Sequence, residues 1–261
     1  MIDIHYINSF YPSQIACNAN FQKHILKEYI QLMVLDFLST SPFARKLTFI
    51  GGTNLRLIKG IDRFSEDLDF DCKGMTDAEF KDMTDSVVTF LLHSGIKIVT
   101  RDKTNSMLTA FRRSIYFPEF LFELGLTGHR EERFLLKIEA QDQGVRYPIE
   151  MKLVQRCGFF FAFPTPPDCV LLSMKLSALL ARAKGRDFYD TLFLWQQTKP
   201  SYDFLSARVG INSSEELKKA LLEKLESANL NDKKRDFEHL LFNSNASEKI
   251  LRFAEFIEMN L

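Results

Sequence analysis

The proline-rich segment PTPPD, at residues 164–168, most constrains the fold, because the hydrophobic pattern differs on its two sides. Before it, apolar residues fall into short strand-like runs separated by helical segments. After it, they recur at spacings of three and four residues with hardly any strand signal. Proline interrupts both kinds of element, since its ring fixes φ and removes an amide donor. The sequence therefore predicts an α+β domain over residues 1–163 and an α-helical bundle domain over residues 164–261.

The expected elements follow from the same spacings. In the first domain we predict helices at 19–40 and 76–94, a short helix closed by Gly60, and strands at 47–50 and from Asp67. Further strand candidates lie at 96–103, 106–117, 134–141 and 149–162. In the second domain we predict helices at 167–183, 186–197, 202–208, 214–228, 232–242 and 246–259.

Composition excludes several classes of protein. Hydrophobic residues make up 46% of the 261 residues, which is enough for a buried core. Basic and acidic residues number 34 each, so net charge gives no reason to expect affinity for nucleic acid or membranes. The four cysteines are scattered, without zinc-site or disulfide-framework spacing. No secretion signal and no apolar stretch of about 18 residues is present, so we expect a cytoplasmic protein.

The segment RFSEDLDFD lies in a strongly acidic stretch of the chain. Nine acidic and three basic residues lie between Asp62 and Asp85, a local charge of −6. On a strand, Asp67, Asp69 and Asp71 share one face, while the apolar residues between them face the core. Two such carboxylates can share a hard cation, and Mg²⁺ prefers oxygen ligands. An acidic pair of this kind is, by itself, also typical of a solvated edge strand.

The residues upstream of this strand favour the cation-binding interpretation. Gly51, Gly52 and Thr53 form a strand-to-helix turn, where backbone amides and a helix N-terminus can bind phosphate. A glycine pair, a short helix and then a DxD strand mark the DNA polymerase β-like nucleotidyltransferase superfamily. The full string FIGGTNLRLIKGIDRFSEDLDFD closely resembles the AbiEii family, the toxin component of an abortive-infection toxin–antitoxin system. The 14 residues between Gly52 and Asp67 fit the AbiEii form of the motif.

This resemblance implies a fold, a cofactor and a set of site residues. The fold is a mixed sheet flanked by helices, followed by the helical domain. The cofactor is Mg²⁺, with Mn²⁺ as an alternative, and the substrate is a nucleoside triphosphate. The metal ligands implied are Asp67 and Asp69, and the residues near the nucleotide phosphates are Gly51, Gly52, Thr53 and Ser65. Asp71 shares their face but is expected to be a bystander.

A third carboxylate is usual in two-metal nucleotidyl transfer, where it can also help to deprotonate the attacking hydroxyl. In this superfamily it comes from a neighbouring strand. Glu139, in LLKIEAQD, is the best candidate, and Glu150, in PIEMKLV, is the rival. For either residue, an exposed strand carboxylate paired with a lysine is an equally good interpretation.

A second motif follows the domain boundary. It resembles a family motif in which a lysine is followed by an R-x-K-x-RD-x-x-D segment. In this chain the residues are Lys175, Arg182, Lys184, Arg186, Asp187 and Asp190. The resemblance implies that Lys175 contacts the nucleotide phosphates and that Asp187 or Asp190 completes the site or holds the basic residues. The structural alternative is an ion-pair network of Arg186 with the two aspartates at the start of a helix. Because Lys175 lies beyond the boundary, we expect the active site in a cleft between the domains.

The function expected from these motifs is Mg²⁺-dependent transfer of a nucleoside monophosphate to an acceptor hydroxyl. The resemblance implies RNA, such as the tRNA 3′ end, as acceptor, and a separate antitoxin protein as partner. An excess of three basic residues over 97–156 is a weak signal for a phosphate backbone. Transfer to a small molecule or a protein side chain, and a catalytically silent nucleotide-binding regulator, remain alternatives. A phosphatase is disfavoured, because the Thr or Val usual after the second aspartate is missing.

Overall fold

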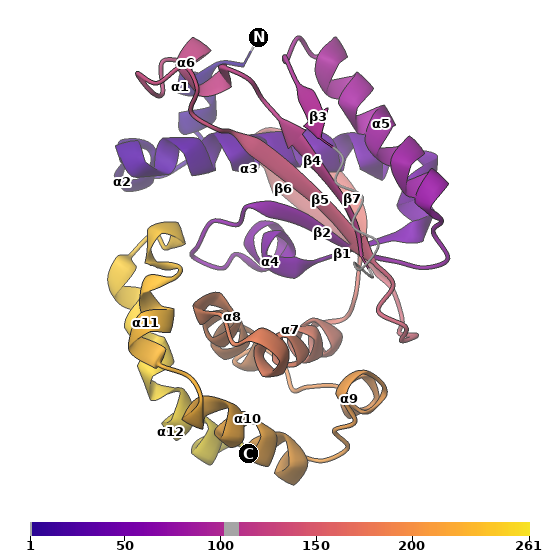
Figure 1. Cartoon of the computed structure of the whole chain (residues 1–261), viewed down its shortest axis with the longest axis vertical. Coiled ribbons are helices and arrows are strands. Elements are labelled where there is room, and N and C mark those ends of the chain that lie inside the picture. Colours follow the sequence, from indigo (N-terminus) through magenta and orange to yellow (C-terminus); the bar gives the residue numbers. More distant parts are fainter. Residues whose placement is uncertain (1, 102–109) are drawn as a thin grey trace. The chain divides into compact units, whose positions relative to one another are not determined.

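The computed structural model describes residues 2–101 and 110–261. It divides into two compact units, which we describe in turn (Figure 1). The first consists of Met1–Gly60, Phe64–Asp142 and Glu150–Thr165, and the second of Ile61–Arg63, Gln143–Ile149 and Pro166–Leu261. The parts of two expected strands that fall on residues 102–109 lie outside the described residues.

The first unit is built on a five-stranded mixed sheet. Its strands in spatial order are β1 (Leu47–Ile50), β2 (Asp67–Cys72), β5 (Leu135–Gln141), β4 (Phe111–Tyr116) and β3 (Val99–Arg101). β2 and β5 are parallel and the other neighbours are antiparallel. Leu68 and Phe70 of β2 and Ile138 of β5 are fully buried on one face, as their alternation with acidic residues predicts. The expected mixed sheet is confirmed.

The expected strand at 149–162 is wrong, because this segment forms a hairpin. β6 (Glu150–Arg156) and β7 (Phe159–Thr165) pair as a separate two-stranded sheet. Cys157 and Gly158, between them, have φ of 49° and 84°, and a two-residue turn of this kind requires positive φ at both positions. Pro164 does not end β7, since it lies in a two-stranded sheet where a missing amide donor is tolerated.

Helices complete the first unit. They are α1 (Ile4–Asn8), α2 (Ser13–Ala16), α3 (Ala19–Ser39), the 3₁₀ helix η1 (Pro42–Lys46), α4 (Gly51–Asn54), the π-helix η2 (Leu55–Lys59), α5 (Asp77–His93) and α6 (Phe120–Glu123). Phe37 of α3 stacks on Phe90 of α5 at 4.6 Å between ring centroids. Phe163 of β7 packs against Phe70 of β2 at 5.8 Å, so the hairpin covers the apolar face of the sheet. α1 and α2 were not expected from the sequence.

The second unit is helical. Its elements are α7 (Asp168–Arg182), α8 (Gly185–Trp195), α9 (Tyr202–Val209), α10 (Ser214–Glu226), α11 (Leu230–Arg235), the 3₁₀ helices η3 (Glu238–Leu240) and η4 (Ser244–Arg252), and α12 (Phe253–Asn260). Edge-to-face contacts of Phe188 with Phe253 and of Trp195 with Phe256 hold α8 against α12. The helices expected at 232–242 and 246–259 are shorter, because 3₁₀ turns replace part of each. Among the described residues, no helix has both the length and the apolar character needed to span a bilayer.

Two short segments that precede Pro166 in the chain also belong to this helical unit. In the segment 61–63, Asp62 accepts a hydrogen bond of 2.6 Å from the Tyr189 hydroxyl, and Arg63 binds Asp190. In the segment 143–149, the Tyr147 ring packs 6.3 Å from the Phe204 ring.

Candidate active site

The start of α4 is fitted to the side chain of Asp69. Ile50 lies opposite Asp69 in the β1–β2 pair, so the next residue, Gly51, begins α4 directly beside the carboxylate. A Cβ at Gly51 would lie 2.1 Å from Asp69 Oδ2. The φ of Gly51 is 79°, a conformation that also favours glycine. Only glycine therefore brings the α4 backbone this close to Asp69.

Thr53 and Ser65, which were predicted to lie near the nucleotide, are both held by hydrogen bonds to neighbouring elements. The buried Thr53 hydroxyl donates a hydrogen bond of 2.5 Å to the Asp67 backbone oxygen, which ties α4 to the first residue of the acidic strand. Ser65 is buried, and its backbone oxygen accepts from Gln31 Nε2 of α3 at 3.2 Å. Gly52 is buried in the same turn.

Two lysines lie near Asp67. Lys137 on β5 lies directly opposite it, with Nζ 3.8 Å from Asp67 Oδ1. Lys27, buried on α3, pairs with Glu66 at 3.4 Å. Burial raises the pKa of Asp67 and the nearby Glu139 and Glu66 carboxylates raise it further, while Lys137 and Lys27 oppose them. A cation bound at Asp67 would relieve this destabilisation of its charged form.

Strand register distinguishes the two candidates for the third carboxylate. Glu139 is the β5 partner of Asp69, so their side chains share one face of the sheet. Glu150 lies in the separate hairpin and pairs with Lys152 at 2.6 Å. Glu139 is held by Arg112 of β4, with Nε at 2.8 Å from Oε1 and Nη2 at 3.1 Å from Oε2. Asp71, at the far end of β2, is fully buried.

The donor chemistry of this face fits a hard divalent cation. Asp67 and Asp69 offer carboxylate oxygens from alternate positions of one strand, and Gly51 leaves space for the second of them. Within residues 2–101 and 110–261, no group of three or more His, Cys, Asp or Glu side chains is arranged to hold a metal ion. Asp67 and Asp69 form a pair of carboxylates on this face, and their oxygen donors could hold a hard cation.

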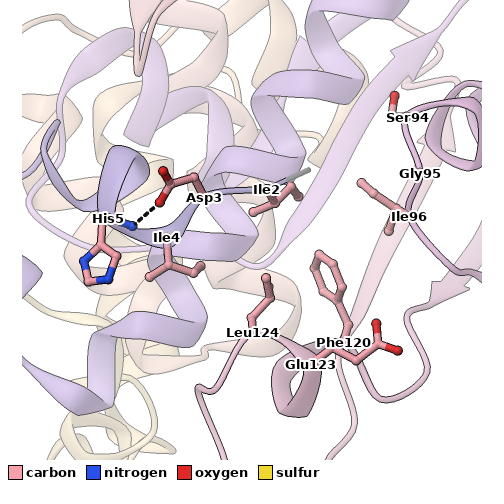
Figure 2. Close-up of a pocket in the computed structure, with 10 residues that line it drawn as sticks. All are labelled: Ile2, Asp3, Ile4, His5, Ser94, Gly95, Ile96, Phe120, Glu123 and Leu124. Carbon is pink, nitrogen blue, oxygen red and sulfur yellow. Dashed lines mark hydrogen bonds between the residues drawn. The ribbon is translucent and has the colours of Figure 1, made fainter.

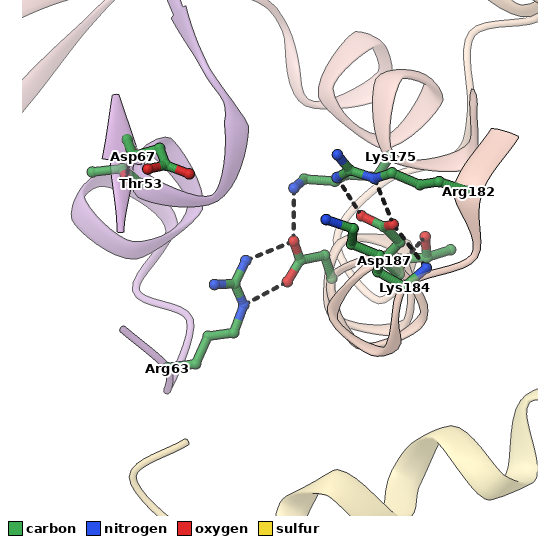
Figure 3. Close-up of polar contacts among 9 residues, drawn as sticks. Thr53, Arg63, Asp67, Lys175, Arg182, Lys184 and Asp187 are labelled. Carbon is green, nitrogen blue, oxygen red and sulfur yellow. Dashed lines mark hydrogen bonds and ion pairs between the residues drawn. The ribbon is translucent and has the colours of Figure 1, made fainter. Parts of the chain in front are cut away.

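In the second unit, the buried carboxylate of Asp190 joins Lys175, a predicted site residue, to Arg63. Asp190 on α8 accepts from Arg63 at 2.7 Å through both of its oxygens and from Lys175 Nζ of α7 at 2.7 Å (Figure 3). Arg63 and Asp190 are fully buried, and Lys175 is nearly so. Arg63 was not expected from the sequence to take this role.

Asp187 holds the start of α8. Arg182 grips both of its oxygens at 2.9 Å, and the Lys184 backbone amide donates to it at 3.2 Å (Figure 3). Of the remaining basic residues of the motif, the side chain of Lys184 is exposed and that of Arg186 is half-buried. The motif therefore combines buried ion pairs with basic groups nearer the surface.

The Asp190 network predicts a measurable pH dependence. Burial alone would raise the pKa of Asp190, but Arg63 and Lys175 outweigh it and lower the pKa to about 2. The carboxyl of the unfolded chain has a pKa of about 3.9. This group therefore stabilises the fold above about pH 4, and its contribution is lost as the pH falls from about 4 to 2. An NMR titration of ¹³C-labelled aspartate carboxyls should give a midpoint for Asp190 near 2, whereas a midpoint at the ordinary value would contradict the network.

A hollow of about 810 Å³ lies in the first unit. It is lined by α1, the turn between α5 and β3, and α6 (Figure 2). Its carboxylates have local partners, since Asp3 accepts from the His5 amide at 2.9 Å and Glu123 pairs with Lys97 at 2.5 Å. None of the predicted site residues lines it.

Comparison with solved structures shows the class of this fold. The chain is similar to MenT4, a nucleotidyltransferase toxin of Mycobacterium tuberculosis H37Rv, with a TM-score of 0.61, 16% identity and coverage of 99% of this chain and 90% of that one. It is also similar to JHP933 from Helicobacter pylori, with a TM-score of 0.53, 18% identity and 90% of each chain covered. The fold is that of a nucleotidyltransferase.

The family follows from the sequence comparison. Residues 33–260 match the family model described as nucleotidyl transferase AbiEii toxin, type IV TA system. The chain belongs to this family and is a nucleotidyltransferase, as the resemblance of residues 49–71 implied. No match was found among curated proteins.

Proposed function

We propose that this protein transfers a nucleoside monophosphate from a nucleoside triphosphate to a hydroxyl of RNA, with pyrophosphate as the leaving group. The observation that carries the proposal is the fit between Gly51 and Asp69, which sets a helix start against the carboxylate that we propose as a metal ligand. Helix starts and glycine turns bind phosphate through backbone amides, and carboxylates bind the metal that accompanies a triphosphate.

The residues of this chain would divide the work. Asp67 and Asp69 would hold Mg²⁺, which stabilises the charge that develops on the transferred phosphate. The amides of Gly51 and Gly52 would position the triphosphate, and Thr53 fixes the turn to β2. Glu139 would accept the proton of the attacking hydroxyl or complete the metal ligands.

We further propose that the motif from Lys175 to Asp190 binds nucleotide phosphates. Asp190 and Asp187 would orient Lys175 and Arg182, and Lys184 and Arg186 would add positive charge. We place the reaction in the cytoplasm, where the four free thiols fit reducing conditions and where nucleotides and RNA are available. The family description names a toxin–antitoxin system, and we propose a separately encoded antitoxin as partner.

Labelling separates the acceptor classes. The purified chain is incubated with Mg²⁺ and each α-labelled nucleoside triphosphate, together with total RNA, protein or small-molecule fractions. We expect label in RNA, including tRNA, and none with the Asp69→Ala variant. Label found only in protein or in small molecules would show that RNA is not the acceptor. Absence of label from every fraction would contradict nucleotidyl transfer.

Growth on expression tests the silent-regulator alternative. We expect expression of the chain to arrest growth, and Asp67→Ala and Asp69→Ala to remove the arrest. If both variants fold normally and still arrest growth, the chain acts without catalysis.

A further inference from the structure

Arg112 is fully engaged with the carboxylate proposed as the third acidic group of the site. Its guanidinium covers both oxygens of Glu139, with Nε at 2.8 Å from Oε1 and Nη2 at 3.1 Å from Oε2. A two-point grip of this kind is the strongest form of arginine–carboxylate contact. A metal ion would need at least one of the same oxygens, so arginine and metal compete for Glu139.

Strand register places this pair beside the proposed metal ligands. Arg112 on β4 is the direct partner of Glu139 on β5, and Glu139 is in turn the partner of Asp69 on β2. Neighbouring strands lie about 4.8 Å apart, so Asp69 and Glu139 stand close enough to repel each other. Asp69, Glu139 and Arg112 thus follow one another across three neighbouring strands, and Arg112 supplies a positive charge next to the two carboxylates.

The neighbouring arginine shows a different role. Arg113 points to the opposite face, is buried, and binds Asp85 at 2.7 Å and Thr84 at 3.2 Å on α5. Arg112 is 45% exposed and Glu139 is 24% exposed. Because the pair is accessible to water, its charges are screened and its partners can exchange more easily than those of a buried pair. Arg113 ties the sheet to α5, whereas Arg112 can leave its carboxylate without disturbing the core.

We propose that Arg112 is an internal counter-cation that holds Glu139 in the metal-free enzyme and must release it before Glu139 can bind a metal. This inference rests on the proposed function, because it assumes that Asp67, Asp69 and Glu139 face a metal during transfer. It makes Arg112 a positioning residue that disfavours binding of a bare metal ion before the nucleotide arrives.

Binding of Mn²⁺ without nucleotide tests the proposal directly, with free Mn²⁺ measured by electron paramagnetic resonance on the full chain. We expect Arg112→Gln to bind Mn²⁺ about 3- to 10-fold more tightly than the wild type, since it removes a competing cation whose charge is partly screened by water. Arg112→Lys, which keeps the charge but loses the two-point grip, should fall between them. Arg130→Gln removes an exposed arginine paired with Glu119 at 3.8 Å and should bind as the wild type does.

A double variant shows whether the gain acts through Glu139. In Arg112→Gln/Glu139→Gln the gain should disappear, because the carboxylate freed by the first change is removed by the second. The proposal is overturned if Arg112→Gln binds Mn²⁺ no more tightly than the wild type, including no measurable binding by either, or if the double variant keeps the gain.

Asp67→Asn and Asp69→Asn distinguish this failure from that of the proposed function. If they leave Mn²⁺ binding unchanged, the metal site itself is misplaced. If they abolish Mn²⁺ binding while Arg112→Gln binds Mn²⁺ as the wild type does, the metal site is correct and only the proposed role of Arg112 is wrong.

Discussion

Gly51→Ala is expected to lower kcat/KM for nucleotidyl transfer by at least about 100-fold, since misplacement of a catalytic group by about 1 Å has effects of this size. The added Cβ would lie 2.1 Å from Asp69 Oδ2 and 2.7 Å from its Cβ, so either the carboxylate or the α4 backbone must move. Steady-state kinetics with the acceptor that the labelling experiment identifies measure the loss.

Gly60→Ala is the matched control. Gly60 has a φ of 76°, close to the 79° of Gly51, but nothing lies within 4 Å of an added Cβ. Both variants should lose about 1–2 kcal/mol of stability from the left-handed conformation, and only Gly51→Ala should lose activity. Equal activity losses in the two variants, or a Gly51→Ala enzyme close to the wild type, would refute the fit between α4 and Asp69.

Asp190→Asn is expected to destabilise the protein by about 3–5 kcal/mol, because removing one partner of a buried ion pair leaves an uncompensated charge. Arg63 and Lys175 both donate to this carboxylate at 2.7 Å, and Arg63 is fully buried. Urea unfolding followed by circular dichroism measures the change.

Glu223→Gln provides the comparison within the same unit. Glu223 pairs with Lys219 at 4.0 Å, and both side chains are largely exposed, so its removal should change stability by less than about 1 kcal/mol. A loss below about 1 kcal/mol for Asp190→Asn would mean that the buried network does not hold α7, α8 and Arg63 together.

The fold could be predicted where the local pattern of apolar and capping residues determines whether a segment forms a helix or a strand. Helix α3 and strand β2 follow from the spacing of apolar residues, and α5 has a capping box of Thr76 and Glu79. The β6–β7 hairpin could not, because its turn depends on Cys157 adopting a positive φ. Cysteine is not a typical turn residue. The strand-like pattern before and after Cys157 therefore predicts one continuous strand.

The part of the candidate site that could be predicted consists of residues that are close together in the sequence. Asp67 and Asp69 stand on one strand, and Gly51 lies a short helix before them. Pairing between distant strands depends on register, which one sequence does not reveal. Arg112 and Glu139 are 27 residues apart, and Arg63 and Asp190 are 127 apart. The ion-pair alternative for the Lys175–Asp190 motif anticipated a network but named Arg186, whereas Arg182 binds Asp187 and Arg63 binds Asp190.

The most direct test of the central claim compares two positions of the label in one nucleoside triphosphate. The purified chain is incubated with Mg²⁺, RNA and the same nucleotide labelled at either the α- or the γ-phosphate, beside the Asp69→Ala variant. We predict that the α-label enters RNA, that the γ-label is released as pyrophosphate, and that the variant does neither. Transfer of the γ-label to RNA, or an Asp69→Ala variant as active as the wild type, would contradict it.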